Sequence, residues 1–263
     1  MSPIPMPLSA LLDAVAIIVR QAESIVMVVY GSEFVVRGKD DKSPVTEADE
    51  RAEQLITEAL RALTPEIPVI GEEAVAAGVA PQIGERFWLV DPLDGTKEFI
   101  SRNGEFTVNV ALIEQGEPVL GVVGAPAQGR LYGGARGVGA WVEEAGGMRQ
   151  PIGCRAAPET GLTVVSSRSH GDAAALEAFL AGKPVADTRF AGSSLKLCLL
   201  AAGQADLYPR LGPTMEWDIA AGHAVLAAAG GTIVDLQGEP LRYGKPDLRN
   251  PHFVASGLCA PAA

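Results

Sequence analysis

The stretch FWLVDPLDGTKEFI, residues 87–100, constrains the fold more than any other part of this 263-residue sequence. An apolar run at residues 87–90 leads directly into two acids three positions apart, Asp91 and Asp94, and the pair Gly95-Thr96 follows. Two carboxylates placed so closely at the end of a buried strand repel each other unless cations lie between them. The stretch therefore predicts a strand that ends at a cation site.

Helical periodicity opens the chain, at residues 8–29 and again at residues 47–63. Within the first segment, the apolar run at residues 11–19 is interrupted by Asp13 and is followed by Arg20 and Glu23. A signal peptide or a membrane span would not carry charges at these places, so we expect an amphipathic helix packed on the core.

The rest of the chain alternates short apolar runs with helical patterns and is typical of layered helices and sheets. We expect an antiparallel meander at residues 106–142, and then a polar, Gly-rich connection at 143–161 between two halves of the chain. The other expected strands are 69–70, 87–90, 162–165, 205–208, 232–236 and 253–255, and the later helices are 172–181, 194–202 and 218–229.

Acids recur at the ends of the expected elements. Glu72 follows the strand 69–70, and Asp218 begins the late helix. Several carboxylates together suit Mg²⁺ or Mn²⁺, whereas zinc prefers His or Cys. The backbone carbonyl of Leu93 adds an oxygen ligand, and Gly95-Thr96 opens a helical turn whose free N–H groups bind an anion such as phosphate.

Each of these features also has a simpler explanation. The DPLDG segment alone is a common solvated turn, and Glu72-Glu73 alone is typical of surface charge. Asp49 fits a capping box with Thr46, and Asp218 alone could serve only as a helix cap. The combination of all four, each at the end of an element, favours a metal site.

Composition excludes several other functions. The net charge of −11, from 21 basic and 32 acidic residues, argues against nucleic-acid binding. Cys154, Cys198 and Cys259 are an odd number at wide spacing, which indicates a reduced compartment such as the cytoplasm. No GxxxxGK[ST] segment occurs, so a P-loop is not expected.

Four motifs together resemble the inositol monophosphatase superfamily of metal-dependent, lithium-sensitive phosphatases. They are TEAD (46–49), GEE (71–73), DPLDGT (91–96) and WDIAAGHAVLAAAGG (217–231). The resemblance implies an αβαβα sandwich like that of fructose-1,6-bisphosphatase, with mixed and antiparallel sheets. It implies a single domain over residues 1–263, with a metal-binding half at about 1–150 and a nucleotide-binding half at about 157–263. It also implies two or three Mg²⁺ ions, with Mn²⁺ as an alternative.

Lys97-Glu98-Phe99 and the segment 191–218 resemble the bisphosphate nucleotidase branch of this superfamily. That branch hydrolyses adenosine 3′,5′-bisphosphate, a small-molecule nucleotide, to AMP and phosphate in sulfate assimilation. The resemblance implies in-line attack by a water at the metal site without a covalent enzyme intermediate. Oligomeric state and peripheral attachment to the inner membrane stay open.

The resemblance also assigns roles to residues. The residues that it implies as metal ligands are Glu72, Asp91, Asp94 and Asp218, with the carbonyl of Leu93. Asp49 resembles the acid that serves a further metal or its water, and Thr96 resembles the residue that orients the attacking water with Glu72. The residues that it implies as substrate-binding are Gly95, Thr96, His170, Ser193, Lys196, Arg210 and Asp218.

Lys196 and Arg210 also make chemical sense as a cationic clamp for a second phosphate in an otherwise acidic protein. His223 lies within an Ala/Gly-rich helix and is interpreted as structural. Two alternatives remain: an inositol or sugar phosphatase with the same metal site, and a non-catalytic nucleotide or metal sensor. An aspartyl-phosphate phosphatase is disfavoured, since its Asp-x-Asp spacing is absent at Asp91 and Asp94.

Overall fold

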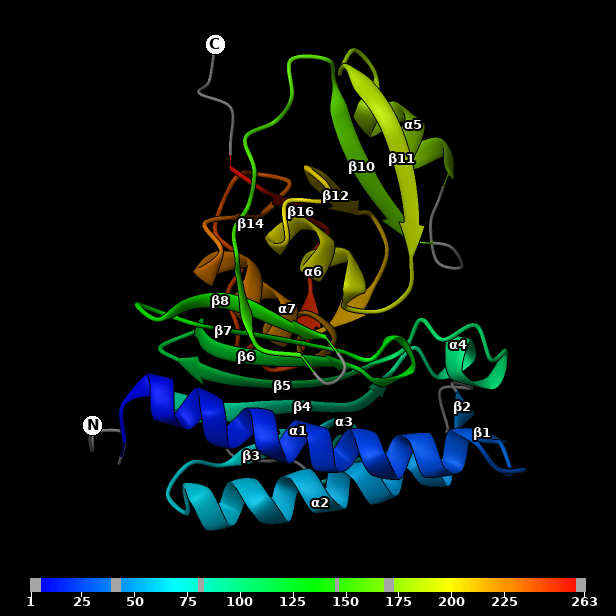
Figure 1. Ribbon diagram of the computed structural model, residues 1–263, viewed down its shortest axis with the longest axis vertical. Helices are drawn as coiled ribbons and strands as arrows, with labels where there is room; N and C mark the ends of the chain where they lie inside the picture. Colours follow the sequence, from blue (N-terminus) through cyan, green and yellow to red (C-terminus); the bar gives the residue numbers. More distant parts are fainter. Residues whose placement is uncertain (1–5, 39–43, 80–82, 145–146, 168–172, 259–263) are drawn as a thin grey trace.

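The chain folds into stacked layers of helices and sheets (Figure 1). The computed structural model describes residues 6–38, 44–79, 83–144, 147–167 and 173–258. The helices are α1 (Leu8–Tyr30), α2 (Glu47–Leu63), α3 (Glu72–Ala76), α4 (Thr96–Ile100), α5 (Ala173–Leu180), α6 (Leu195–Ala201) and α7 (Glu216–Ala228), with a 3₁₀ turn at Pro126–Gln128.

A sheet of seven strands, the first sheet, forms the centre of the N-terminal part. Its strands, in spatial order, are β3 (Val69–Gly71), β4 (Arg86–Asp94), β5 (Thr107–Glu114), β6 (Glu117–Ala125), β7 (Arg130–Ala135), β8 (Gly139–Glu144) and β9 (Gln150–Ile152). β3 and β4 are parallel, and all other neighbours are antiparallel. The meander expected at 106–142 is therefore confirmed.

The C-terminal part contains a second sheet of five strands. Its strands, in spatial order, are β11 (Val185–Ala191), β10 (Leu162–Ser167), β12 (Leu207–Arg210), β16 (Phe253–Ser256) and β14 (Thr232–Asp235). Two short pairs complete the structure: β1 (Arg37–Gly38) with β2 (Pro44–Val45), and β13 (Thr214–Met215) with β15 (Arg249–Asn250). β10 lies parallel to both β11 and β12, whereas β16 is antiparallel to its neighbours.

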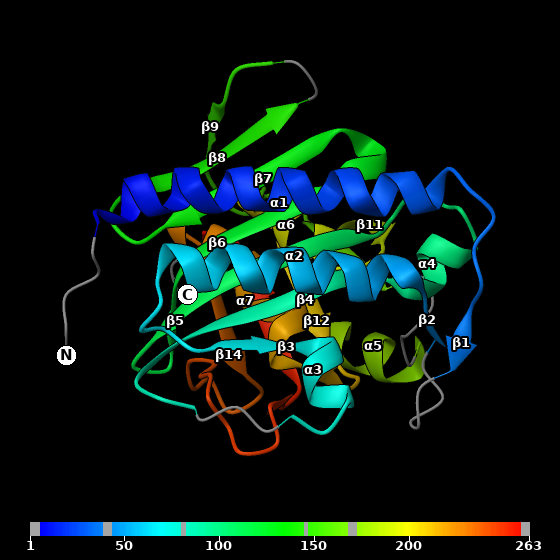
Figure 2. The ribbon, with the colours of Figure 1, turned by 90° about the horizontal axis from the view of Figure 1, so that it is seen from below.

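Helices α1 and α2 lie side by side on one face of the first sheet, and α6 and α7 lie between the two sheets (Figures 1 and 2). One face of α1 is buried, including Leu11, Val15 and Val19, while Ile17 and Val28 on the other face are exposed. The amphipathic packing expected for residues 8–29 and the αβαβα layering are both confirmed. No helix in the described part of the chain is long and apolar enough to cross a membrane.

Some expected boundaries are wrong. The connection expected at 143–161 instead contains the end of β8 and all of β9, since β9 adds a short edge to the first sheet. The strand expected at 205–208 lies at 207–210, where it pairs with β16. Strand β11 was not expected, because its residues 185–190 are exposed and mostly polar or small.

Candidate active site

A cavity of about 280 Å³ lies where the end of β4 meets the first turns of α3, α4 and α7. It brings together most of the residues that the sequence singled out. Those that line it are Glu72, Asp91, Leu93, Asp94, Gly95, Thr96, Ser193, Lys196, Arg210 and Asp218. We call Glu72, Asp91, Asp94 and Asp218 the acid group, and Lys196 with Arg210 the basic pair. His170 lies outside the described residues, so its place in the site stays a prediction.

The strand β4 carries two members of the acid group. The strand expected to stop at residue 90 in fact continues to Asp94, because Asp91 pairs with Asn109 and Asp94 pairs with Thr107 of β5. The register shifts between the two acids, as in a β-bulge. Asp91 is 1% exposed, and its Oδ1 accepts the N–H of Leu93 at 3.0 Å. The bulge thus directs both carboxylates into the cavity.

Gly95 makes the sharp change of direction from β4 into α4. Its φ of +89° lies in the left-handed region, where a residue with a side chain would be strained. Thr96 then begins α4, as the expected helical turn required. Its hydroxyl lies 3.4 Å from Oδ1 of Asp49 and 3.3 Å from the carbonyl of Leu93. The orientation of a water by Thr96 together with Glu72 stays a prediction.

Asp49 contacts both the start of its own helix and Thr96. Its Oδ2 accepts the N–H of Thr46 at 2.8 Å and the hydroxyl of Thr46 at 2.7 Å, which completes the capping box of α2. Its other oxygen faces Thr96. Burial raises the pKa of Asp49 to about 6, hydrogen bonds from Thr46 lower it, and the charge of Glu72 raises it further.

Asp218 lies in the first turn of α7, not at its cap position. Met215 is the residue before the helix, and Oδ2 of Asp218 accepts its N–H at 2.9 Å. The carbonyl of Asp218 accepts the hydroxyl of Ser194 at 2.6 Å, which ties α7 to the start of α6. Asp218 therefore caps α7 and also lines the cavity.

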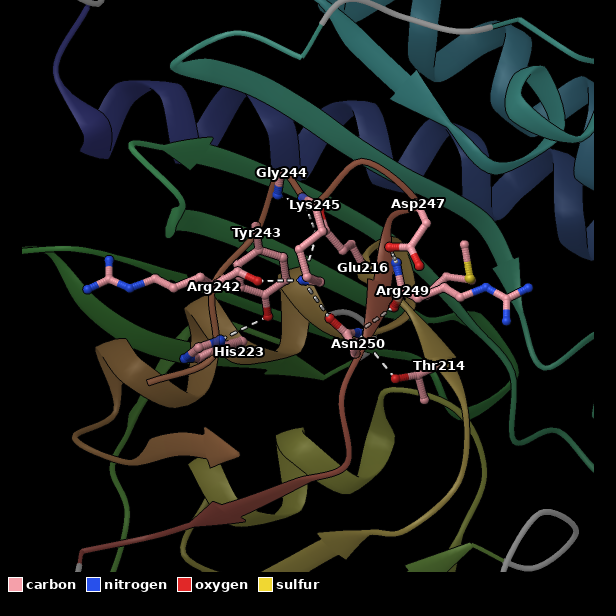
Figure 3. A network of polar contacts seen from close by, with 11 residues as sticks. Thr214, Glu216, His223, Arg242, Tyr243, Gly244, Lys245, Asp247, Arg249 and Asn250 are labelled. Carbon is pink, nitrogen blue, oxygen red and sulfur yellow. Dashed lines mark hydrogen bonds and ion pairs between the residues drawn. The ribbon is translucent and has the colours of Figure 1, made fainter. Parts of the chain in front are cut away.

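The start of α7 is anchored by a network that surrounds Glu216 (Figure 3). The side chain of Glu216 is fully buried, and its carboxylate accepts the N–H of Gly244 at 2.7 Å and that of Lys245 at 3.0 Å. The ammonium of Lys245 also lies 2.6 Å from it. Two turns further along α7, Nδ1 of His223 lies 2.9 Å from the hydroxyl of Tyr243. His223 does not line the acidic cavity, and its structural role stays a prediction.

The acid group is electrostatically strained. Burial raises the pKa of Asp91 well above its usual range, and the charges of Glu72, Asp94 and Asp218 raise it further. Burial likewise raises the pKa of Asp218, with added repulsion from Asp94 and Glu72. The pKa of Asp94 rises to about 6 through burial, partly offset by the nearby Lys196. Repulsion of this kind is what bound divalent cations relieve.

The donor set fits hard cations. It consists of carboxylate oxygens and the carbonyl of Leu93, which are the ligands that Mg²⁺ and Mn²⁺ prefer. Within the described residues, no three His, Cys, Asp or Glu side chains already converge on a single point as a finished cage. The residues that line the cavity therefore have the right chemistry for Mg²⁺.

Lys196 extends from α6 and is only 5% exposed. Its ammonium donates to the carbonyl of Ser193 at 2.7 Å and to that of Ala191 at 3.3 Å, and it lies 5.4 Å from the ring centre of Tyr208. Burial lowers its pKa to about 8, while the charge of Asp94 opposes the change. Lys196 therefore places a buried cationic group beside the acid group.

Glu105, in the loop between α4 and β5, bonds to the loop before α6. Its carboxylate accepts the N–H of Gly192 at 3.0 Å, and its carbonyl accepts the hydroxyl of Ser193 at 2.9 Å. Ser193 has a φ of +38°, which is unusual for a residue with a side chain and marks a constrained backbone. The two parts of the chain are thus fixed to each other at the cavity.

Arg210, the second member of the basic pair, ends β12. Its Nη2 donates to the carbonyl of Pro213 at 3.0 Å, and its charge acts on both Lys196 and Asp218. Tyr208, two residues earlier on the same strand, also lines the cavity. The basic pair therefore shares one cavity with the acid group.

Sequence reasoning missed some residues at this site. Asn109 is fully buried, and its Nδ2 lies 3.5 Å from Oδ2 of Asp94. Glu98, 6% exposed, lines the cavity one turn after Gly95. A polar Asn in the apolar run TVNVALIE was the available signal for the first, and an acid next to Phe99 in a short helix was the signal for the second.

The sequence model of the inositol monophosphatase family matches residues 8–261. The chain belongs to the inositol monophosphatase family. It is 51% identical, over 94% of its length and 99% of the relative's, to the 3′(2′),5′-bisphosphate nucleotidase CysQ of Escherichia coli O157:H7. It is 33% identical to the CysQ nucleotidase of Haemophilus influenzae over 94% of this chain and 93% of the relative.

Solved structures agree with this family. A CysQ from Bacteroides thetaiotaomicron, a bacterial member of the inositol monophosphatase family, superimposes with a TM-score of 0.79 at 36% identity. The match covers 94% of this chain and 97% of that one. An IMPase of Thermotoga maritima matches with a TM-score of 0.75 at 27% identity, over 93% and 91% of the two chains. The expected fold and family are both confirmed.

Proposed function

We propose that this chain is a Mg²⁺-dependent phosphatase that hydrolyses the 3′-phosphate of adenosine 3′,5′-bisphosphate to give AMP and phosphate. The observation that carries the proposal is the pairing of the acid group with the basic pair in one cavity. A bisphosphate needs cations at two separate places, and an inositol monophosphate needs them at one. The two curated relatives named above, which match over nearly the whole chain, are bisphosphate nucleotidases.

We expect separate groups of residues to bind the metal and the transferred phosphate. Glu72, Asp91, Asp94 and Asp218 would hold Mg²⁺ with the carbonyl of Leu93. When bound, Mg²⁺ lowers the pKa of water and stabilises negative charge on phosphate oxygens. The backbone N–H groups at Gly95 and Thr96 would bind the transferred phosphate at the start of α4.

Proton transfer and binding of the second phosphate would involve the following side chains. Glu72 would accept the proton of the attacking water and orient that water together with Thr96, and Asp49, in contact with Thr96, would serve a further metal or its water. The basic pair and Ser193 would hold the second phosphate, since Arg and Lys form charge-assisted hydrogen bonds with phosphate oxygens. His170 completes this proposed set.

The proposal extends to the setting of the reaction. We expect it in the cytoplasm, as a step that clears a by-product of sulfate assimilation, with inhibition by lithium. The support is the resemblance of the motifs, together with cysteine usage: Cys154 and Cys198 are free thiols, and burial raises the pKa of Cys154 to about 11. Cys259 lies outside the described residues.

The test is phosphate release from adenosine 3′,5′-bisphosphate and from inositol 1-phosphate, each with Mg²⁺ and with chelator. We expect Mg²⁺-dependent release with a strong preference for the nucleotide, and its loss in Asp91→Asn. Asp187→Asn on the exposed strand β11 is the matched control and should behave as wild type. Preference for inositol phosphate would replace the substrate assignment, and release from neither would favour a non-catalytic sensor.

A further inference from the structure

The carboxylate of Glu53 is buried close to the acid group, although it does not line the cavity. Glu53 lies on α2, one turn after Asp49, and is 7% exposed. Residues four apart lie on the same face of a helix, so α2 presents two buried acids toward the same region. A buried charge is costly unless hydrogen bonds compensate it. The contacts of Glu53 therefore indicate its purpose.

Those contacts are with the helix that begins at Glu72. Oε2 of Glu53 accepts the N–H of Glu73 at 2.8 Å, and Oε1 accepts the N–H of Ala74 at 2.7 Å. The first N–H groups of a helix have no partner within it, and Gly71, which precedes α3, has no side chain to supply one. Glu53 thus caps α3 from a different helix and fixes its first turn against α2.

The lack of a side chain at Gly71 makes room for the carboxylate of Glu53. A Cβ atom added there would lie 2.4 Å from Cδ of Glu53 and 2.6 Å from each carboxylate oxygen. The φ of Gly71 is −106°, which any residue adopts, so the glycine serves close approach and not backbone conformation. Glu53 therefore bonds to the chain just after Glu72, and the glycine just before Glu72 leaves room for its carboxylate.

We propose that Glu53 is a positioning residue that directs Glu72 into the acid group. The inference rests on the proposed function, in which Glu72 is a metal ligand and accepts a proton. Groups that orient metal ligands typically contribute 10- to 100-fold to metal affinity or activity. The bidentate contact sets the direction in which the Cα–Cβ bond of Glu72 points, because that bond belongs to the turn that Glu53 fixes.

The experiment compares wild type with Glu53→Gln by Mn²⁺ titration, in which electron paramagnetic resonance counts free Mn²⁺. In Glu53→Gln the side-chain amide opposes one of the two N–H groups, so we expect Mn²⁺ binding to weaken roughly 10- to 100-fold. In the phosphate-release assay, kcat should fall by a similar factor, and KM for the nucleotide should stay within about twofold because the basic pair is untouched. Glu58→Gln, on the exposed face of the same helix, is the matched control.

A double-mutant cycle separates positioning from a general effect on folding. If Glu53 acts through Glu72, Glu53→Gln should not weaken Mn²⁺ binding further in a Glu72→Gln background. An equal loss in both backgrounds, or wild-type Mn²⁺ affinity in Glu53→Gln, would overturn the proposal.

If Glu53→Gln does not fold, Glu53→Asp carries the same test, since it keeps the charge and withdraws it by one methylene. Wild-type Mn²⁺ affinity in a folded Glu53→Asp protein would likewise contradict the proposal. Wild-type protein that binds Mn²⁺ without hydrolysing either substrate would refute the proposed function alone, and the titration would still decide the role of Glu53.

Discussion

The repulsion within the acid group predicts that removing one of its charges stabilises the metal-free protein. Asp94 is the suitable position, because its pKa of about 6 in the folded state lies well above the value of about 3.9 for an exposed aspartate. At pH 7.5 that difference costs the folded state about 3 kcal/mol. The Asn109 contact survives in Asp94→Asn, since an amide oxygen also accepts a hydrogen bond.

The sign of the pH dependence follows from the raised pKa. The folded state binds a proton at Asp94 more readily than the unfolded state does, so the cost is fully present above pH 6 and disappears as the pH falls below the unfolded pKa. The advantage of Asp94→Asn over wild type should therefore be about 3 kcal/mol at pH 7.5 and about half of that at pH 5. At pH 7.5 it corresponds to an increase of roughly 6–12 °C in Tm.

The assay is urea unfolding in chelator and in Mg²⁺. Wild type should gain about 2.7 kcal/mol from Mg²⁺ at a hundred times its Kd, whereas Asp94→Asn should gain little and lose hydrolysis. Asp187→Asn, on the exposed strand β11, should change by less than about 0.5 kcal/mol. The reasoning fails if metal-free Asp94→Asn is no more stable than wild type at pH 7.5.

Four further substitutions test other features of the structure. Lys196→Met and Arg210→Ala should each lower kcat/KM for adenosine 3′,5′-bisphosphate about 10- to 100-fold, because each removes a charged hydrogen-bond donor. The hydrolysis of inositol 1-phosphate should be affected much less. Equal losses in initial rates on both substrates would contradict this prediction. Burial lowers the pKa of His223 to about 3, so its unfolded form takes up a proton first and stability is lost as the pH falls below about 6.5. Relative to His223→Gln, wild type should lose about 2 kcal/mol of urea-unfolding free energy between pH 7.5 and 5, and parallel pH profiles would show that His223 is not the cause. Gly95→Ala should lower kcat more than 10-fold in the phosphate-release assay. The φ of +89° at this position is unfavourable for alanine, and the added Cβ would lie 3.3 Å from the carbonyl of Glu105, so the turn should shift. An unchanged kcat would exclude a role for the turn.

The local motifs predicted the position of most of the acid group, because strand ends and helix starts are encoded within a few residues. Asp91, Asp94 and Asp218 lie in the cavity for that reason. The bulge that carries β4 past residue 90 was missed, since it depends on pairing with Thr107 and Asn109 of the next strand.

Long-range contacts explain the other misses. The contact of Glu53 with α3 joins residues 20 and 21 positions apart, and no local pattern announces it. β11 is an exposed edge strand, so it lacks the apolar alternation that marks half-buried strands. In both cases the tertiary structure, not the local sequence, determines the contact.

The position of α7 has a consequence for how the protein is made. This helix packs against β5, β6 and β7 from one side and against α6 from the other, and it also brings Asp218 to the cavity. A growing polypeptide that stops before residue 216 leaves an apolar face of its first sheet bare and its acid group incomplete. The nascent chain therefore has no complete site until α7 has been synthesised, because packing of this helix both covers the sheet and brings Asp218 to the cavity.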